Sequence, residues 1–329
     1  MQHLAHRPWI AAGVALVGAG AIAATPVAAL PGLPAVHFPT VALTADFDPL
    51  GAWQDVFDTA KANVTTLTDS AVPMVAMQQL IANLINGDSI DPKAIIDAIA
   101  QPDTDINLSP SPLTLSNDGL QTLVALVLPQ YLPSDFPLST DELTPILSFM
   151  ASPLSGVLMG ALGPSIAPLV ALGNSVTEIG NALSGDDADV SAALQEMANL
   201  PANMLGGFLN GATVDLAGLI PTLTDAGLLP EEMDVTALSY TFGGLLSPGS
   251  TANDVEGFLN GITDGSSPGI GGSILNGLGL TTGLMGFPLV IDGQGVGPIG
   301  AWEGLQEIIA MTLGWDGVGN PLEDLAGSL

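Results

Sequence analysis

Glycine is concentrated in the last third of this chain, and it restricts what that part can fold into. Of the 40 glycines, 23 lie in residues 206–304, and 11 of those lie in residues 271–304. A glycine inside a helix costs about 0.5–1 kcal/mol relative to alanine. We therefore expect a Gly-rich mixed α/β region over residues 206–315, without long helices before its last segment.

Two strand candidates lie in this Gly-rich region. Residues 238–242 alternate apolar and hydroxyl side chains, as a half-buried strand does. Residues 287–291 form the second candidate and end in Asp292-Gly293. Apolar side chains then recur at helical spacing over residues 301–313. The sequence predicts a short β-hairpin followed by a closing helix.

Residues 46–205 show helical periodicity instead. Asp48-Pro49 and Asp91-Pro92 each offer a capping carboxylate followed by proline at the first helical position. Ser139 with Glu142 fits a capping box. We interpret the apolar stripes of the first helices as core-facing. The first two stripes comprise Trp53, Val56, Ala60, Val64, Leu67 and Ala71, then Met74, Met77, Leu80, Ile81, Leu84 and Ile85.

Residues 143–177 carry no charged side chain. We expect the prolines in this stretch to divide it into short helices and to remove any clean apolar run of ~20 residues. Gly156 and Gly160 form G-x-x-x-G, a weak signal for close packing in membranes. Two interpretations stay open, a buried helical hairpin and a membrane-buried segment. Asp189 then caps a helix through Leu200, and Pro201 is expected to start another.

The charge balance is strongly acidic. The chain has 3 Lys plus Arg against 33 Asp plus Glu, a formal net charge of −30, and no positive side chain beyond Lys93. Nucleic-acid binding is excluded because phosphate contacts need Lys or Arg. Anionic lipid headgroups are disfavoured for the same reason. The surface either attracts cations and basic partners or simply keeps an apolar chain soluble.

The N-terminus has the pattern of an export signal. Residues 1–29 contain Arg7, an apolar run of about 15 residues and small residues that allow cleavage between Ala23 and Ala29. Residues 30–47 are Pro-containing and are expected to be an extended lead-in. Residues 316–329 are expected to be a loose acidic tail.

The side chains of common active sites are missing from the body of the chain. Its histidines are His3, His6 and His37, all before the first predicted helix, and it has no cysteine. This excludes a Ser-His-Asp triad, a His zinc site and a Cys nucleophile from the body. Residues 163–167 resemble a G-x-S-x-G elbow but fail at the last position. An exported hydrolase is therefore the weakest interpretation.

Two ligand motifs are incomplete. Residues 295–300 form G-x-G-x-x-G, but the chain ends too soon for the second strand and ribose carboxylate of a dinucleotide site. Asp103, Asp105 and Asn107 match three calcium-loop positions, but the loop lacks its glycine and bidentate Glu. Pairs of neighbouring acids are too common to indicate acid/base catalysis; they include Asp186/Asp187, Glu231/Glu232 and Glu323/Asp324. We assign no catalytic, cofactor-binding or metal-binding residue and predict that the protein is not an enzyme.

Several segments resemble a known family. Residues 7–28, the start of the first helix from Asp48 to Trp53, and residues 200–216, 242–249 and 271–304 are similar to segments of the GjpA-type outer-membrane porins of mycolic-acid-containing actinobacteria. In the last of these segments the similarity includes the Gly-Pro-Ile-Gly-Ala-Trp of residues 297–302. The resemblance implies an exported channel for small hydrophilic solutes in the mycolate outer membrane. It transfers no catalytic residue.

The expected fold is mainly α, with a helical region over residues 46–205 before the Gly-rich region. The expected function is a porin-like envelope protein, a homo-oligomer if it forms a pore, which favours cations because it is acidic. Because few strand candidates exist, each chain would contribute either a hairpin or helices from residues 143–177. The alternative is a secreted or surface-attached interaction protein without enzymatic activity.

Overall fold

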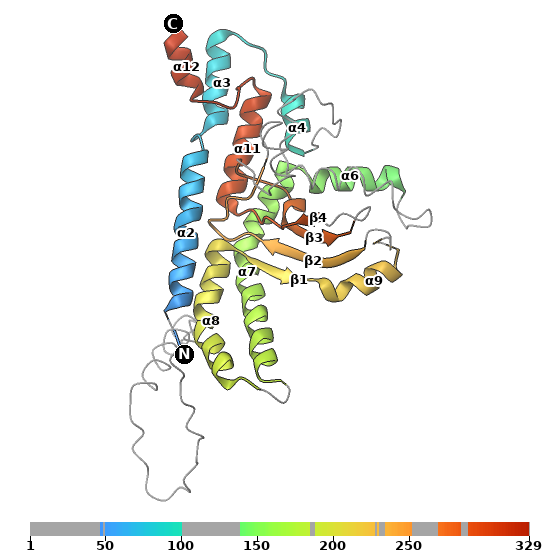
Figure 1. Ribbon diagram of the computed structural model, residues 1–329. Coiled ribbons are helices and arrows are strands. Elements are labelled where there is room, and N and C mark those ends of the chain that lie inside the picture. Colours follow the sequence, from blue (N-terminus) through green and yellow to red (C-terminus); the bar gives the residue numbers. More distant parts are fainter. Residues whose placement is uncertain are drawn as a thin grey trace, which may run out of the picture. The chain divides into compact units, whose positions relative to one another are not determined.

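The computed structural model describes residues 47, 48, 50–100, 139–184, 188–227, 229, 234–251, 269–283 and 289–328. All of them belong to one compact unit, Leu43–Leu329, and Figure 1 shows its elements. The predicted export signal over residues 1–29 lies outside the described residues. The same holds for the strand candidate's first residues, 287 and 288.

The first helices begin and end close to their predicted positions. Helix α2 spans Gly51–Ser70, and the Asp48 carboxylate accepts hydrogen bonds from the amides of Leu50 and Gly51, both at 3.0 Å. Helix α3 spans Val75–Asn86 and ends at Gly87, whose φ of 79° suits glycine. Helix α4 spans Pro92–Ala100. The Asp-Pro pairs at residues 48–49 and 91–92 therefore predicted where α2 and α4 begin to within about two residues.

The uncharged stretch folds differently from the prediction. Helix α6 spans Thr140–Met150, and helix α7 continues for 30 residues over Pro153–Ala182 with two prolines inside it. Helix α8, Val190–Asn210, likewise runs through Pro201. The prediction that these prolines end helices was wrong. A proline removes one hydrogen bond and bends a helix, and packing against neighbouring elements can offset that cost.

The Gly-rich region contains a four-stranded antiparallel sheet. Its strands are β1 Ala212–Asp215, β2 Val235–Phe242, β3 Leu278–Thr282 and β4 Leu289–Ile291, adjacent in that order. The predicted strand over 238–242 is confirmed as part of β2. The sheet has more strands than the single hairpin that we expected.

One face of this sheet has its own hydrophobic core. Leu238, Leu280 and Ile291 are buried together, and Leu280 is paired with Ile291 across β3 and β4. Apolar residues from the connection after β1 pack against them. That connection contains the 3₁₀ turn η1, Ala217–Leu219, and helix α9, Ile220–Asp225.

The closing helix is confirmed, but the tail is not loose. Helix α11 spans Pro298–Thr312 and packs against α3, α4 and α7. Helix α12, Pro321–Ser328, lies within the predicted acidic tail and packs against α3, as Figure 1 shows. Asn320 places its carbonyl and side-chain oxygens at the start of α12, which the composition of the tail did not indicate.

The apolar stripe of α3 is exposed, so our core assignment was wrong for this helix. The residues that α3 buries are Val75, Ala82 and Asn83, and Val75 packs with Ala310 and Trp315. Most of the large side chains lie on the other side: Met74, Met77, Ile81, Leu84 and Ile85. Helical spacing identified an apolar face here but not the side that the fold covers.

The Gly-rich stretch 271–304 lies largely inside the fold. Ile270 is 1% exposed, and Ser273 and Asn276 are fully enclosed, with the Asn276 side chain donating to the carbonyl of Ser250 at 2.8 Å. A Cβ added at Gly297 would overlap the Gly244 carbonyl oxygen. The stretch packs backbone against backbone in the interior. The idea that it is an outward-facing hairpin is not supported by its described residues.

Candidate functional site

Helix α7 has two opposite faces, and the inner one consists of small residues. A Cβ added at Gly156 would overlap the carbonyl oxygen of Gly272, and one added at Gly163 would overlap that of Gly243. The backbone of α7 therefore touches the backbone of the Gly-rich region. The buried residues of this face, which we call the inner face of α7, are Gly156, Gly160, Gly163, Ala167, Ala171 and Ser175.

The opposite side carries large apolar side chains that remain exposed. With 3.6 residues per turn, these positions lie about 140–220° around the helix from Ala167. Each is exposed by 50–65%. We call them the outer face of α7: Leu158, Leu162, Leu169, Val176 and Leu183. The last four are seven residues apart, which gives a continuous stripe rather than scattered apolar residues.

The outer face is suited to an apolar environment by its length and its lack of charge. Thirty residues of helix span about 45 Å, more than the ~30 Å hydrocarbon layer of a bilayer. α7 is also the one helix among the described residues that is long and apolar enough to cross a membrane. Only 28% of the most apolar 18-residue segment of α7 is buried within the fold, whereas the core helix of a soluble protein is mostly buried.

Polar residues gather at the C-terminal end of α7. Thr177, Glu178 and Asn181 are exposed, and Asn174 donates to the carbonyl of Thr213 on β1 at 2.9 Å. The first two thirds of the helix are uncharged, whereas its last turns carry hydrogen-bonding groups.

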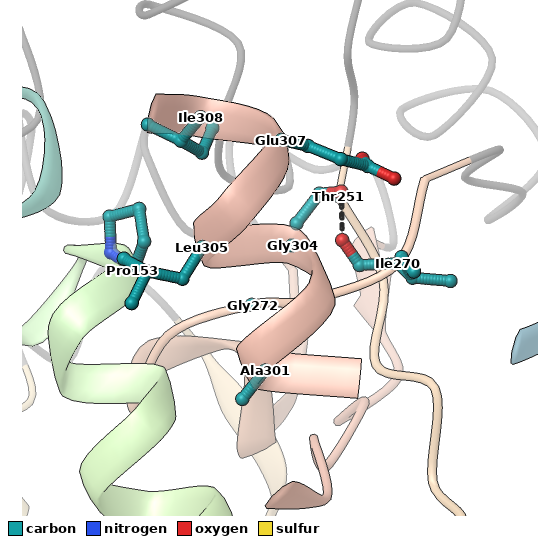
Figure 2. A pocket seen from close by; sticks show the side chains of 9 residues that line it. All are labelled: Pro153, Thr251, Ile270, Gly272, Ala301, Gly304, Leu305, Glu307 and Ile308. Atoms are coloured by element: carbon teal, nitrogen blue, oxygen red, sulfur yellow. Dashed lines mark hydrogen bonds between the residues drawn. The ribbon is translucent and has the colours of Figure 1, made fainter. Parts of the chain in front are cut away.

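The cavity found beside the described part of the Gly-rich stretch is too small for a ligand. Figure 2 shows the cavity beside α11, where the Thr251 hydroxyl donates to the carbonyl of Ile270 at 2.9 Å. The cavity holds about 10 Å³, enough for one water at most. Glu307 lies at its edge and is 5% exposed.

The glycines of the G-x-G-x-x-G sequence, residues 295–300, pack closely against another segment of the backbone. Added Cβ atoms at Gly295, Gly297 and Gly300 would collide with backbone atoms of residues 241–248. Protein backbone therefore occupies the space that a pyrophosphate would need. The glycines allow close approach of two chain segments.

The structure describes only some of the remaining candidate residues, which are the calcium-like motif and the pairs of neighbouring acids. The calcium-like residues Asp103, Asp105 and Asn107 lie outside the described residues, as do Asp186/Asp187 and Glu231/Glu232. Glu323 and Asp324 lie in the first turn of α12, where the helix dipole favours acids. Within the described ranges, no group of three or more His, Cys, Asp or Glu side chains is placed to hold a metal ion.

Two titratable groups have shifted pKa values through burial. Burial raises the pKa of Tyr240 to about 12, and its hydroxyl donates to the carbonyl of Ile274 at 2.8 Å. Burial also raises the pKa of Glu303 on α11. Tyr240 lies inside the Gly-rich region and holds β2 to the turn before β3. Its role is structural.

One sign of the outer face of α7 was present in the sequence. The seven-residue spacing of Leu162, Leu169 and Val176 is visible in the sequence, but the expected breaks at Pro164 and Pro168 obscured it. The inner face could be read from Gly156 and Gly160 only as a weak packing motif.

Comparisons with protein-family models, with curated proteins and with solved structures gave no match to this chain.

Proposed function

We propose that this protein is an exported, non-enzymatic envelope protein that places the outer face of α7 in an apolar membrane. In this proposal several copies assemble there and allow passive diffusion of small hydrophilic solutes, as a porin does. The observation that carries the proposal is the exposed, uncharged outer face of a 30-residue helix. The mycolate outer membrane is the setting that the sequence resemblance suggests.

The inner face of α7 supports this arrangement. Backbone contacts such as Gly163 with Gly243 leave no space for side chains to repack and so hold α7 in a fixed orientation. Lipid contact would cover large side chains such as Leu169, 65% exposed, and would require no rearrangement of the fold.

The strands favour a helical route for solutes over a strand route. Among the described strands the longest, β2, has 8 residues and β4 has 3, whereas a spanning strand needs ~9–11 residues. The pathway would therefore run between copies of α7 and its neighbours. The net charge of −30 would raise the local concentration of cations at its entrances.

The exposed stripe of α3 favours a second candidate function. Its large side chains, including Leu84 and Ile85, lie on a helix too short to span a bilayer and match the pattern of a helix-in-groove partner surface. A secreted or surface-attached interaction protein would use this stripe to bind another protein.

Planar-bilayer recording of the purified protein distinguishes the two functions. The porin-like proposal predicts discrete conductance steps with a reversal potential that favours cations. Heat-denatured protein at the same concentration serves as the control. Absence of steps, or clear anion preference, would contradict the proposal and favour the interaction protein.

A further inference from the structure

A second surface lies between helices α2 and α8, and its chemistry differs from that of α7. A groove of about 510 Å³ runs along the two helices. The groove is broad and open to solvent, and its volume is within the range of about 300–1,000 Å³ found for small-molecule sites. α8 lines it with a row of carboxamide side chains, Gln195, Asn199, Asn203 and Asn210, and α2 faces this row with Asp55 and Thr59.

The ends of the row are fixed by hydrogen bonds to Asp48, just before α2, and to α2 itself. The Gln195 carboxamide accepts from the Asp48 amide at 3.0 Å and donates to the Asp48 carbonyl at 2.8 Å. At the other end, Asn210 donates to the Val56 carbonyl at 2.9 Å and accepts from Asn63 at 3.2 Å. These bonds hold the two walls of the groove at a set distance.

The middle of the row keeps unused hydrogen-bonding capacity. The Asn199 Oδ1 accepts from Gln195 at 2.8 Å, and the Asn203 Nδ2 donates to Glu196 at 2.8 Å and Ser175 at 3.0 Å. Within the described part of the chain, no hydrogen bond involves the Asn199 Nδ2, the Asn203 Oδ1 or the Asp55 carboxylate. A carboxamide nitrogen has two donor hydrogens and each oxygen two acceptor positions. Residues that line the groove therefore keep both a donor and acceptors without a partner in the described part of the chain.

This combination selects one class of ligand. An anion would meet Asp55 and no Lys or Arg in the lining, and an apolar ligand would leave the carboxamides unsatisfied. A bare cation would bind the acceptor oxygens but could not accept a hydrogen bond from the Asn199 Nδ2. We propose that the groove binds a neutral polyhydroxylated molecule, such as a sugar, whose hydroxyls both donate and accept. The inference goes beyond solute passage and does not depend on membrane insertion of α7.

Isothermal titration of the purified protein with maltose, a neutral probe that fits the groove's chemistry, tests this proposal. We expect saturable binding of maltose, and no binding of calcium chloride or potassium phosphate at the same concentrations. Heat from calcium chloride with none from maltose would overturn the proposal in favour of a cation site. Absence of maltose binding up to about 1,000 times the protein concentration would overturn it outright.

Matched variants locate the site. Asp55→Ala and Asn199→Ala are each expected to weaken maltose binding about tenfold or more, because each removes a hydrogen bond to the ligand. Asp58→Ala is the control, since it removes an exposed acid from the same helix outside the groove. Equal losses for Asp55→Ala and Asp58→Ala would contradict the assignment. Unchanged circular dichroism and melting temperature would show that both variants fold.

Discussion

Helix α3 and the glycine-rich stretch 271–304 differ in opposite ways from what their composition suggests. The apolar stripe of α3 was expected in the core, and the glycine-rich stretch was expected at the surface. The large apolar side chains of α3 are exposed, whereas most described residues of the stretch are packed inside, including Leu275, Leu280 and Ile291. The glycines of the stretch let backbones touch in the interior, and several of its large side chains pack into the core around them. The large side chains of α3 lie on the side of that helix that the fold leaves exposed. Apolar spacing alone is therefore a poor guide to the core of this protein.

The same contrast occurs within one helix, α7, and two alanine substitutions test it there. Gly163→Ala is expected to lower the free energy of unfolding by about 2–4 kcal/mol, because the new Cβ meets the Gly243 carbonyl. Gly173→Ala has open space around it and is expected to raise stability by about 0.5–1 kcal/mol. Urea denaturation measures both. Equal effects would show that the inner face is not closely packed.

The outer face of α7 should matter for membrane binding and not for folding. Leu169→Asp places a charge where the proposal puts lipid, at a cost of about 2.5–3.5 kcal/mol. We expect the partition coefficient into phosphatidylcholine vesicles, measured by flotation, to fall about 100-fold. Asn181→Asp, an exposed charge away from the outer face, is the control. Flotation that survives Leu169→Asp would mean that another surface meets the membrane.

Burial of Tyr240 inside the Gly-rich region should make the free energy of unfolding depend on pH. The pKa of Tyr240 is raised from 10.0 to about 12, so the unfolded state loses this proton at lower pH than the folded state. Stability is therefore full below pH 10 and is lost as pH rises from 10 towards 12. We expect a loss of about 1–2 kcal/mol over this window, allowing for partial exposure.

Tyr240→Phe provides the matched variant for this titration. It removes the hydroxyl and should flatten the unfolding free energy between pH 10 and 12. It should also lower stability at pH 7 by about 1 kcal/mol, through loss of the hydrogen bond to Ile274. An unchanged slope above pH 10 would assign the pH dependence to another group.

The smallest effect is expected on the exposed stripe of α3. Leu84→Gln should change the free energy of unfolding by less than about 0.5 kcal/mol, since Leu84 is 65% exposed. Leu67→Ala on α2, a buried leucine, should cost about 2–5 kcal/mol. Thermal or urea unfolding compares them. A large loss for Leu84→Gln would restore our original assignment of this stripe to the core.

Local signals in the sequence were enough to predict many element boundaries. Capping by Asp48 and Asp189 depends on neighbours within a few residues. The predicted capping box at Ser139 and Glu142 is confirmed, and the Glu142 carboxylate accepts hydrogen bonds from the amide and the hydroxyl of Ser139. These hydrogen bonds also lower the pKa of Glu142.

The remaining features depend on contacts between distant parts of the chain. Whether Pro164 ends a helix depends on the packing of α7 against α8, α11 and the sheet, which no local pattern contains. The groove between α2 and α8 joins residues such as Asp48 and Gln195 that are 147 positions apart. The exposed face of each helix is likewise set by its partners.

Fluorescence of a label at position 169 tests the central claim most directly. The chain has no cysteine, so Leu169→Cys gives a single labelling site for an environment-sensitive fluorophore, with Asn181→Cys as the matched control. Added to phosphatidylcholine vesicles that carry a lipid-bound quencher, the label at 169 is predicted to shift to the blue and to be quenched. The label at 181 should change much less. Equal, water-like emission at both positions would contradict the membrane-facing role of α7.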